Sequence, residues 1–191
     1  MRTSKLTLLP ALLLLSASGM AQQTGPAAEN VTPAPAPPSA PPAYPCEHGE
    51  KFREFDFWLG EWGVRTADGR LAGHNSIRPA ERGCLLTEHW TNTSGGTGMS
   101  INYFDKVANK WVQVWLAEGG SQIMISGGMT DEGMSLLGTL HDIGSGSTVP
   151  FRGLWTPLAD GRVRQYFEQS NDGGVTWVPW FEGFYSRVEK N

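Results

Sequence analysis

The 191-residue sequence contains few of the motifs that mark an enzyme or a metalloprotein. It has no Gly-x-Ser-x-Gly segment, the motif that presents the nucleophilic serine of α/β-hydrolases. No glycine-rich stretch follows a strand and opens a helix, which argues against a phosphate-binding loop. The four histidines have neither His-x-His nor His-Glu-x-x-His spacing. We therefore expect no metal site and no cofactor.

Basic clusters and long apolar runs are also scarce. The sequence has 15 Lys and Arg against 19 Asp and Glu, a formal net charge of −4. An acidic chain without a basic patch binds nucleic acid and anionic membranes poorly, so we expect neither as a partner. No run reaches the ~20 apolar residues that cross a bilayer, so we expect no transmembrane segment in the mature chain.

A shorter apolar segment, residues 6–15, follows two basic residues near the N-terminus and precedes small residues that end at Ala21. This order predicts a secretory signal peptide, residues 1–21, cleaved near Ala21. A membrane anchor is the alternative, which Pro10 and the shortness of the run disfavour. Cleavage would change the formal charge from −4 to −6 and leave a periplasmic or secreted protein.

Two regions follow the leader. Residues 22–45 are rich in Pro and Ala without apolar periodicity, which predicts an extended, disordered linker. Residues 46–191 have the length of one domain. The sequence holds 24 Gly and eight Trp, most of the Gly in this last region, a composition typical of strands and tight turns.

The only two cysteines, Cys46 and Cys84, both lie in the exported part. In an oxidising compartment we expect them to form a disulfide between the start of the domain and an early strand. Two free thiols or half of a metal site are the alternatives. Neither cysteine belongs to a Cys-x-x-Cys or Cys/His spacing, which favours the disulfide.

One short helix is expected over residues 47–58, because Phe52, Phe55 and Trp58 recur at helical spacing. Beyond it, β-rich runs alternate with turns about every ten residues, too closely for crossover helices. Strands are expected near residues 61–67, 71–79, 84–93, 97–104, 111–117, 121–127, 134–141, 149–157, 162–170 and 175–188.

About ten successive strands should pair as antiparallel neighbours, and an open sheet of that length would expose two edges. An all-β, up-and-down barrel with a short N-terminal helix removes both edges. A two-sheet β-sandwich is the alternative. Asp68-Gly69 and Asp160-Gly161 predict two-residue hairpin turns, because both central positions need positive φ.

The segment Phe57–Trp62 resembles the opening of lipocalins and related calycin barrels, a helical turn followed by Gly-x-Trp. Gly60 and Trp62 occupy that pattern. The resemblance implies that Trp62 closes one end of the barrel and that Arg187, near the last strand, lies over it. A wider set of segments is similar to an exported bacterial family with a lipocalin-like domain: Phe55–Trp62, Glu88–Trp90, Asn102–Tyr103, Trp111–Trp115, Arg164–Gln165 and Ser170–Gly174. That similarity implies a fold and a compartment, but no reaction.

Residues 170–177 match the Asp-box, S-x-D-x-G-x-x-W, and so resemble a repeat of sialidases. A glycosidase is one interpretation. A single copy in a domain too short for a propeller favours a local role instead. We expect Ser170 and Asp172 to bond turn amides while Trp177 packs beneath them, which would staple a hairpin.

Two hairpins indicate what lines the barrel. If residues 105–110 form a loop, Asn102 faces Gln113, with Trp111 and Trp115 on the same face of the sheet. Two indoles together favour the interior over solvent, although an outer face is the alternative.

A two-residue turn at Asp160-Gly161 would place Arg152 and Gln165 on one face as well. Arg152 would then meet Glu88 or an acidic ligand, unless it is an ordinary surface cation. We predict a common lumen, with no catalytic residue assigned, lined by Glu88, Asn102, Gln113, Trp115, Arg152 and Gln165.

Three functions fit this lining. A barrel that binds a small apolar or amphipathic molecule in the cell envelope is favoured, since aromatic walls with a few polar groups are typical of ligand pockets. An envelope hydrolase or isomerase with Glu88 or Glu168 as base is the second. A structural barrel with a filled interior is the third. A haem barrel of the nitrobindin type is disfavoured, because no histidine lies on the last two expected strands.

Overall fold

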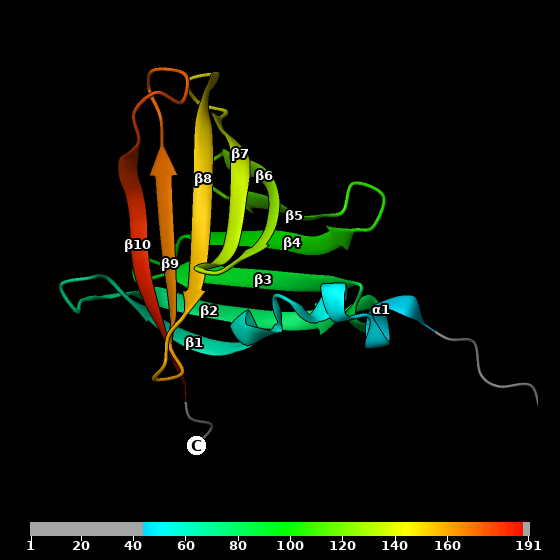
Figure 1. Cartoon of the computed structure of the whole chain (residues 1–191). Helices are drawn as coiled ribbons and strands as arrows, with labels where there is room; N and C mark the ends of the chain where they lie inside the picture. The colour runs from blue at the N-terminus through cyan, green and yellow to red at the C-terminus, as the bar shows by residue number, and fades with distance from the viewer. Residues whose placement is uncertain (1–43, 189–191) are drawn as a thin grey trace, which may run out of the picture. The chain divides into compact units, whose positions relative to one another are not determined.

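Each strand pairs with its neighbour in the chain, because the connections are too short to reach another partner. The computed structural model describes residues 44–188. In that range ten strands form one closed antiparallel barrel, in which β10 pairs back onto β1. In Figure 1, β1–β4 run across the view while β7–β10 stand upright, as strands do when a twisted sheet closes on itself. The predicted up-and-down barrel is confirmed, and the sandwich is excluded.

The strands are β1 Gly60–Arg65, β2 Leu71–Ala80, β3 Leu85–Asn92, β4 Thr97–Asp105, β5 Lys110–Ala117, β6 Ser121–Thr130, β7 Gly133–Asp142, β8 Ser147–Pro157, β9 Val163–Gln169 and β10 Val178–Arg187. Short helical turns precede them: α1 Pro45–His48, η1 Glu50–Arg53 and η2 Asp56–Trp58; a further turn, η3 Glu81–Gly83, follows β2. The predicted signal peptide and linker residues 22–43 lie outside the described residues. Between residues 44 and 188 no helix is long and apolar enough to cross a membrane.

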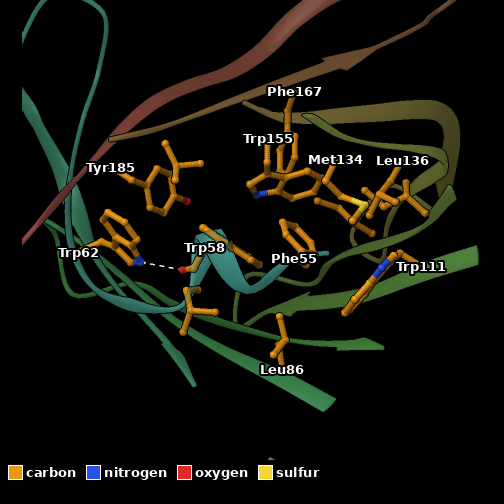
Figure 2. Packing of buried hydrophobic residues seen from close by; sticks show 14 of the residues in the cluster. Phe55, Trp58, Trp62, Leu86, Trp111, Met134, Leu136, Trp155, Phe167 and Tyr185 are labelled. Atoms are coloured by element: carbon orange, nitrogen blue, oxygen red, sulfur yellow. Dashed lines mark hydrogen bonds between the residues drawn. The ribbon is translucent and has the colours of Figure 1, made fainter. Parts of the chain in front are cut away.

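The single helix predicted over residues 47–58 is wrong, because extended backbone at Gly49 (φ −77°, ψ 122°) separates α1 from η1. Residues 45–58, here called the plug segment, run into the barrel as three separate turns. The ring of Phe55 lies 5.6 Å from that of Trp111 and 5.3 Å from that of Trp155. Figure 2 shows Phe55 and Trp58 of the plug segment among core residues from several strands. Much of the barrel interior is therefore filled.

Two features hold the plug segment. Cys46 and Cys84 form the predicted disulfide, with Cα atoms 4.8 Å apart. Trp62 is buried, and its Nε1 donates to the carbonyl of Trp58 at 2.9 Å. The Arg187 guanidinium lies 4.5 Å from the Trp62 ring centroid.

Gly60 makes room for this arrangement. Its φ is +144°, and a Cβ added there would lie 2.5 Å from Nη1 of Arg187. Any other residue at this position would be strained at this φ and would displace the Arg187 guanidinium from its place over Trp62.

Both Asp-Gly hairpins have loops of three residues, so the predicted two-residue turns are wrong. Leu158 N donates to the carbonyl of Arg162 at 2.8 Å, which leaves residues 159–161 as the loop. Thr66 N and the Arg70 carbonyl make the same bond at 3.0 Å. Gly at the third loop position, in the left-handed region, is typical of such loops.

The longer loop changes which residues of β8 face inward. Trp155, not Thr156, lies opposite Gln165. A shift of one residue turns every side chain of a strand to the other face. The predicted inward face of β8 is therefore its outward face.

Candidate ligand-binding site

The predicted hairpin between β4 and β5 has the expected register, with Asn102 opposite Gln113 and Ser100 opposite Trp115. Asn102 and Gln113 point inward and are buried, as are Glu88 on β3 and Gln165 on β9. Trp115 is half-buried and faces the same interior. Five of the six residues predicted to share a lumen thus lie on the inner surface of the barrel.

Arg152 does not join them, so its predicted place in the lumen is wrong. It lies on the outer face of β8, where its Nε donates to Oε2 of Glu168 at 2.6 Å. Its side chain is 44% exposed, and its guanidinium lies 4.4 Å from the ring centroid of Trp177. Because Glu168 faces outward with Arg152, it cannot serve as a base inside the barrel. The register shift in the β8–β9 hairpin accounts for the error at Arg152. Glu168 lies three positions after the inward-facing Gln165 on the same strand, so it faces outward in either register.

A cavity of about 160 Å³ remains between the filled part of the barrel and the surface. Its walls are mostly aromatic. The lining residues are Glu88, Trp90, Gln113, Trp115, Ile123, Gln165, Phe167, Trp180, Phe181 and Tyr185. The rings of Trp90 on β3 and Phe181 on β10 form a T-shaped pair, with centroids 6.3 Å apart.

A row of buried polar side chains runs behind this aromatic wall. Gln113 Nε2 donates to Asn102 Oδ1 at 2.9 Å, and Asn102 Nδ2 donates to Ser100 Oγ at 2.8 Å. The Ser100 hydroxyl donates to Glu88 Oε2 at 2.6 Å. The row thus leads from the cavity amide of Gln113 to the cavity carboxyl of Glu88.

The row continues on the far side of the carboxyl. Asn75 Nδ2 donates to Glu88 Oε1 at 2.7 Å and to the Tyr185 hydroxyl at 3.2 Å. The Tyr185 hydroxyl in turn donates to Oε1 of Gln165. All these side chains are buried, where an unmade hydrogen bond is costly.

A backbone carbonyl fixes the direction of the first bonds. Asn102 Nδ2 also donates to the carbonyl of Leu86 at 3.3 Å, so its Oδ1 must face Gln113. Gln113 must then present Nε2 to Asn102, which leaves its Oε1 as a free acceptor. Within residues 44–188, Oε1 of Gln113 and Oδ1 of Asn75 have no hydrogen-bond partner. Of these two residues, only Gln113 lines the cavity.

Burial controls the charge of the row. It raises the pKa of Glu88 above the ordinary value of 4.5, against the opposing effect of the bonds from Ser100 and Asn75. Burial, together with the nearby Glu88 carboxyl, also raises the pKa of Tyr185 well above 10. Tyr185 is therefore a neutral donor, as its bond to Gln165 requires.

Sequence reasoning missed several residues of this site. Ser100 and Asn75 lie two positions from other buried residues on β4 and β2, a period that could have placed them inside. Tyr185 lies two positions before Arg187, on the inward face of β10. No sequence pattern indicated that the plug segment fills part of the barrel. How deeply it enters depends on contacts between segments that are distant in the chain.

The Asp-box lies outside this site. Asp172 Oδ1 accepts bonds from Val175 N at 3.0 Å and from Thr176 N at 2.8 Å, while Ser170 Oγ accepts from Gly174 N at 2.7 Å. These are local bonds within the loop between β9 and β10. The Thr176 hydroxyl donates to Asp172 Oδ2 at 2.6 Å and contributes most to lowering the pKa of Asp172 to about 2; the backbone bond from Thr176 comes second.

The fold and the site together define a closed ten-stranded β-barrel with one buried polar row beside a small aromatic cavity. Comparison of the chain with protein-family models and with curated proteins finds no match. No group of three His, Cys, Asp or Glu side chains in the described range could hold a metal ion.

Proposed function

We propose that this protein is a small-molecule-binding barrel of the cell envelope. The observation that carries the proposal is the cavity of about 160 Å³, left open beside a core that is otherwise filled by aromatic side chains. Apolar walls with a few placed polar groups are typical of ligand pockets. The disulfide supports an oxidising compartment, and the resemblance to exported lipocalin-like domains supports the same assignment.

The size of the cavity restricts the ligand. Drug-sized ligands occupy pockets of roughly 300 Å³ or more, whereas an apolar cavity near 150 Å³ accommodates a single benzene ring. We therefore propose a ligand of about one ring in size, mostly apolar, with its polar part toward Gln113 and Glu88.

Filling the cavity tests this proposal. Ile123 on β6 lines the cavity, whereas its neighbour Met124 points outward and is 59% exposed. Ile123→Phe should occupy the cavity and abolish binding of small aromatic compounds, measured by ligand-observed NMR and by quenching of Trp fluorescence. Met124→Phe, the matched control, should bind as the wild type does. Equal binding by both variants, or no binding by the wild type, would contradict the proposal.

Proton transfer by Glu88 is the second candidate function. A carboxyl with a raised pKa inside a cavity is a feature of general acids and bases. Because Glu168 faces outward, a pair of facing carboxylates is not available, and a one-base isomerisation is the reaction that remains. Deuterium exchange from D2O into a small ketone, lost in Glu88→Gln, would distinguish this function from binding alone.

A further inference from the structure

The charges around the cavity restrict its ligand more than its volume does. Among residues 44–188, Glu88 is the only charged one that lines it; the other lining residues are aromatic, aliphatic or amide. In the part of the chain that the structure describes, no Lys, Arg or His forms an ion pair with Glu88. An anionic ligand would meet a carboxyl and no cation, so carboxylates and phosphates are disfavoured.

The hydrogen bonds around Glu88 are arranged for a carboxylate. Ser100 accepts from Asn102 and donates its one proton to Oε2, while Asn75 donates to Oε1. A protonated Glu88 would need an acceptor for its own O–H, and neither the Ser100 hydroxyl nor the Asn75 amide, bonded as they are, supplies one. Burial without a counterion nevertheless opposes the carboxylate. A cation bound in the cavity would remove this conflict.

The walls suit a cation as well. Three indoles, Trp90, Trp115 and Trp180, line the cavity with Phe167 and Phe181. The faces of such rings attract organic cations, most strongly where water is excluded. Gln113 lines the same cavity with an Oε1 that accepts no bond from the described residues, and an ammonium group carries N–H donors to spare.

We infer that the cavity binds a small organic cation, a protonated amine on about one apolar ring. The ammonium donates to Glu88 and Gln113 and lies against the aromatic walls, which hold the ring. This inference rests on the proposed binding function and names the chemical class of its ligand.

A series of matched ligands tests the inference on the wild-type protein. Benzylammonium, benzyl alcohol and toluene share one ring and differ in charge and donors; benzoate reverses the charge. Calorimetry should show benzylammonium binding ~10-fold more tightly than benzyl alcohol, as expected for a charge-assisted site, and no binding of benzoate. Toluene or benzyl alcohol binding as tightly as benzylammonium would overturn the inference and leave the binding function standing. If none of the four bound, the binding function itself would fail.

Variants then assign the charge selectivity to Glu88. Glu88→Gln should weaken benzylammonium ~10-fold while the affinity for benzyl alcohol stays within about twofold. Glu168→Gln, on the outer face, removes an equal charge and should change neither affinity. Unchanged benzylammonium binding in Glu88→Gln would overturn the inference. If this variant does not fold, as a melting curve would reveal, the wild-type ligand series decides alone.

Discussion

Glu88 is the residue at which burial and hydrogen bonding oppose each other most directly. Two donors favour its carboxylate, while burial favours the acid and has the larger effect on its pKa. The folded protein therefore keeps this proton to a higher pH than the unfolded chain does. This difference makes folding stability depend on pH in a direction that can be measured.

We predict that Glu88 lowers stability as the pH rises above about 4.5, the ordinary glutamate value. Above that pH the unfolded chain releases the proton that the folded protein still holds. The free energy of unfolding should fall by up to ~1.4 kcal/mol per pH unit until the raised folded pKa is passed. Glu88→Gln lacks this contribution, so the wild type should lose stability relative to the variant. Urea denaturation over this pH range checks it, and a constant difference between the two proteins would contradict it.

Trp62 is the second residue whose contribution can be measured. Its ring is 1% exposed and lies between Arg187 and the plug segment. Trp62→Ala should cost about 3–5 kcal/mol, because it opens a cavity and leaves the Trp58 carbonyl without its donor. Thermal denaturation measures the loss. A variant that melted at the wild-type temperature would exclude a structural role for this indole.

The sequence placed a residue correctly inside the barrel only where a second feature showed which face of its strand points inward. In β4 and β5 one choice of loop put Asn102 and Gln113 on the same face as Trp111 and Trp115, and the two indoles indicated that this face points inward. Arg152 had no such support, because its side followed from an assumed turn. The raised pKa of Glu88 could not be predicted from the sequence, since it depends on burial by segments far away in the chain.

Among the secondary-structure elements, the lengths of the hairpin loops were predicted least well. An Asp-Gly pair fits the last two positions of a three-residue loop as well as a two-residue turn. Ten strands and their order followed from spacing alone, because short connections leave no other partner. The aromatic residues of 47–58 recur at helical spacing, but the backbone there forms three separate helical turns and not one helix.

Gly161 provides a test of the loop geometry. Its φ is +83°, and a Cβ added there would meet nothing within 4 Å, so only backbone strain opposes alanine. Gly161→Ala should cost about 1–2 kcal/mol. Gly119 has equally open surroundings without a positive φ, so Gly119→Ala should be neutral or stabilising. Chemical denaturation compares the two, and equal effects would contradict the loop assignment.

The disulfide between Cys46 and Cys84 ties the plug segment to the turn before β3. It closes a loop with a sequence separation of 38 residues. The double variant Cys46→Ser/Cys84→Ser should lose roughly 3–4 kcal/mol, chiefly because its unfolded chain is less constrained. Urea denaturation of the oxidised wild type and the variant measures this. A difference below about 1 kcal/mol would show that other contacts hold the plug segment unaided.

For the whole molecule, barrel closure is uneven. β1 and β10 pair through four residues each, from Trp62 opposite Arg187 to Arg65 opposite Phe184. β6 and β7 pair over their full lengths, from Ser121 opposite Asp142 to Thr130 opposite Gly133. We predict that amide hydrogens in the β1–β10 ladder exchange faster than those between β6 and β7, because local opening begins where pairing is shortest. Hydrogen exchange measured by NMR checks this; equal protection would contradict it.

The same ladder has a consequence for the order of folding. Every other pair of strands joins neighbours in the chain, and such hairpins form within roughly 1–10 μs. Closure instead brings together segments as distant as Leu59 and Arg187, which are 128 positions apart. Fixing so long a loop carries a large entropic cost before any contact compensates it. The slow event in folding should therefore be the arrival of β10 beside Trp62, after the hairpins and the plug segment have already assembled.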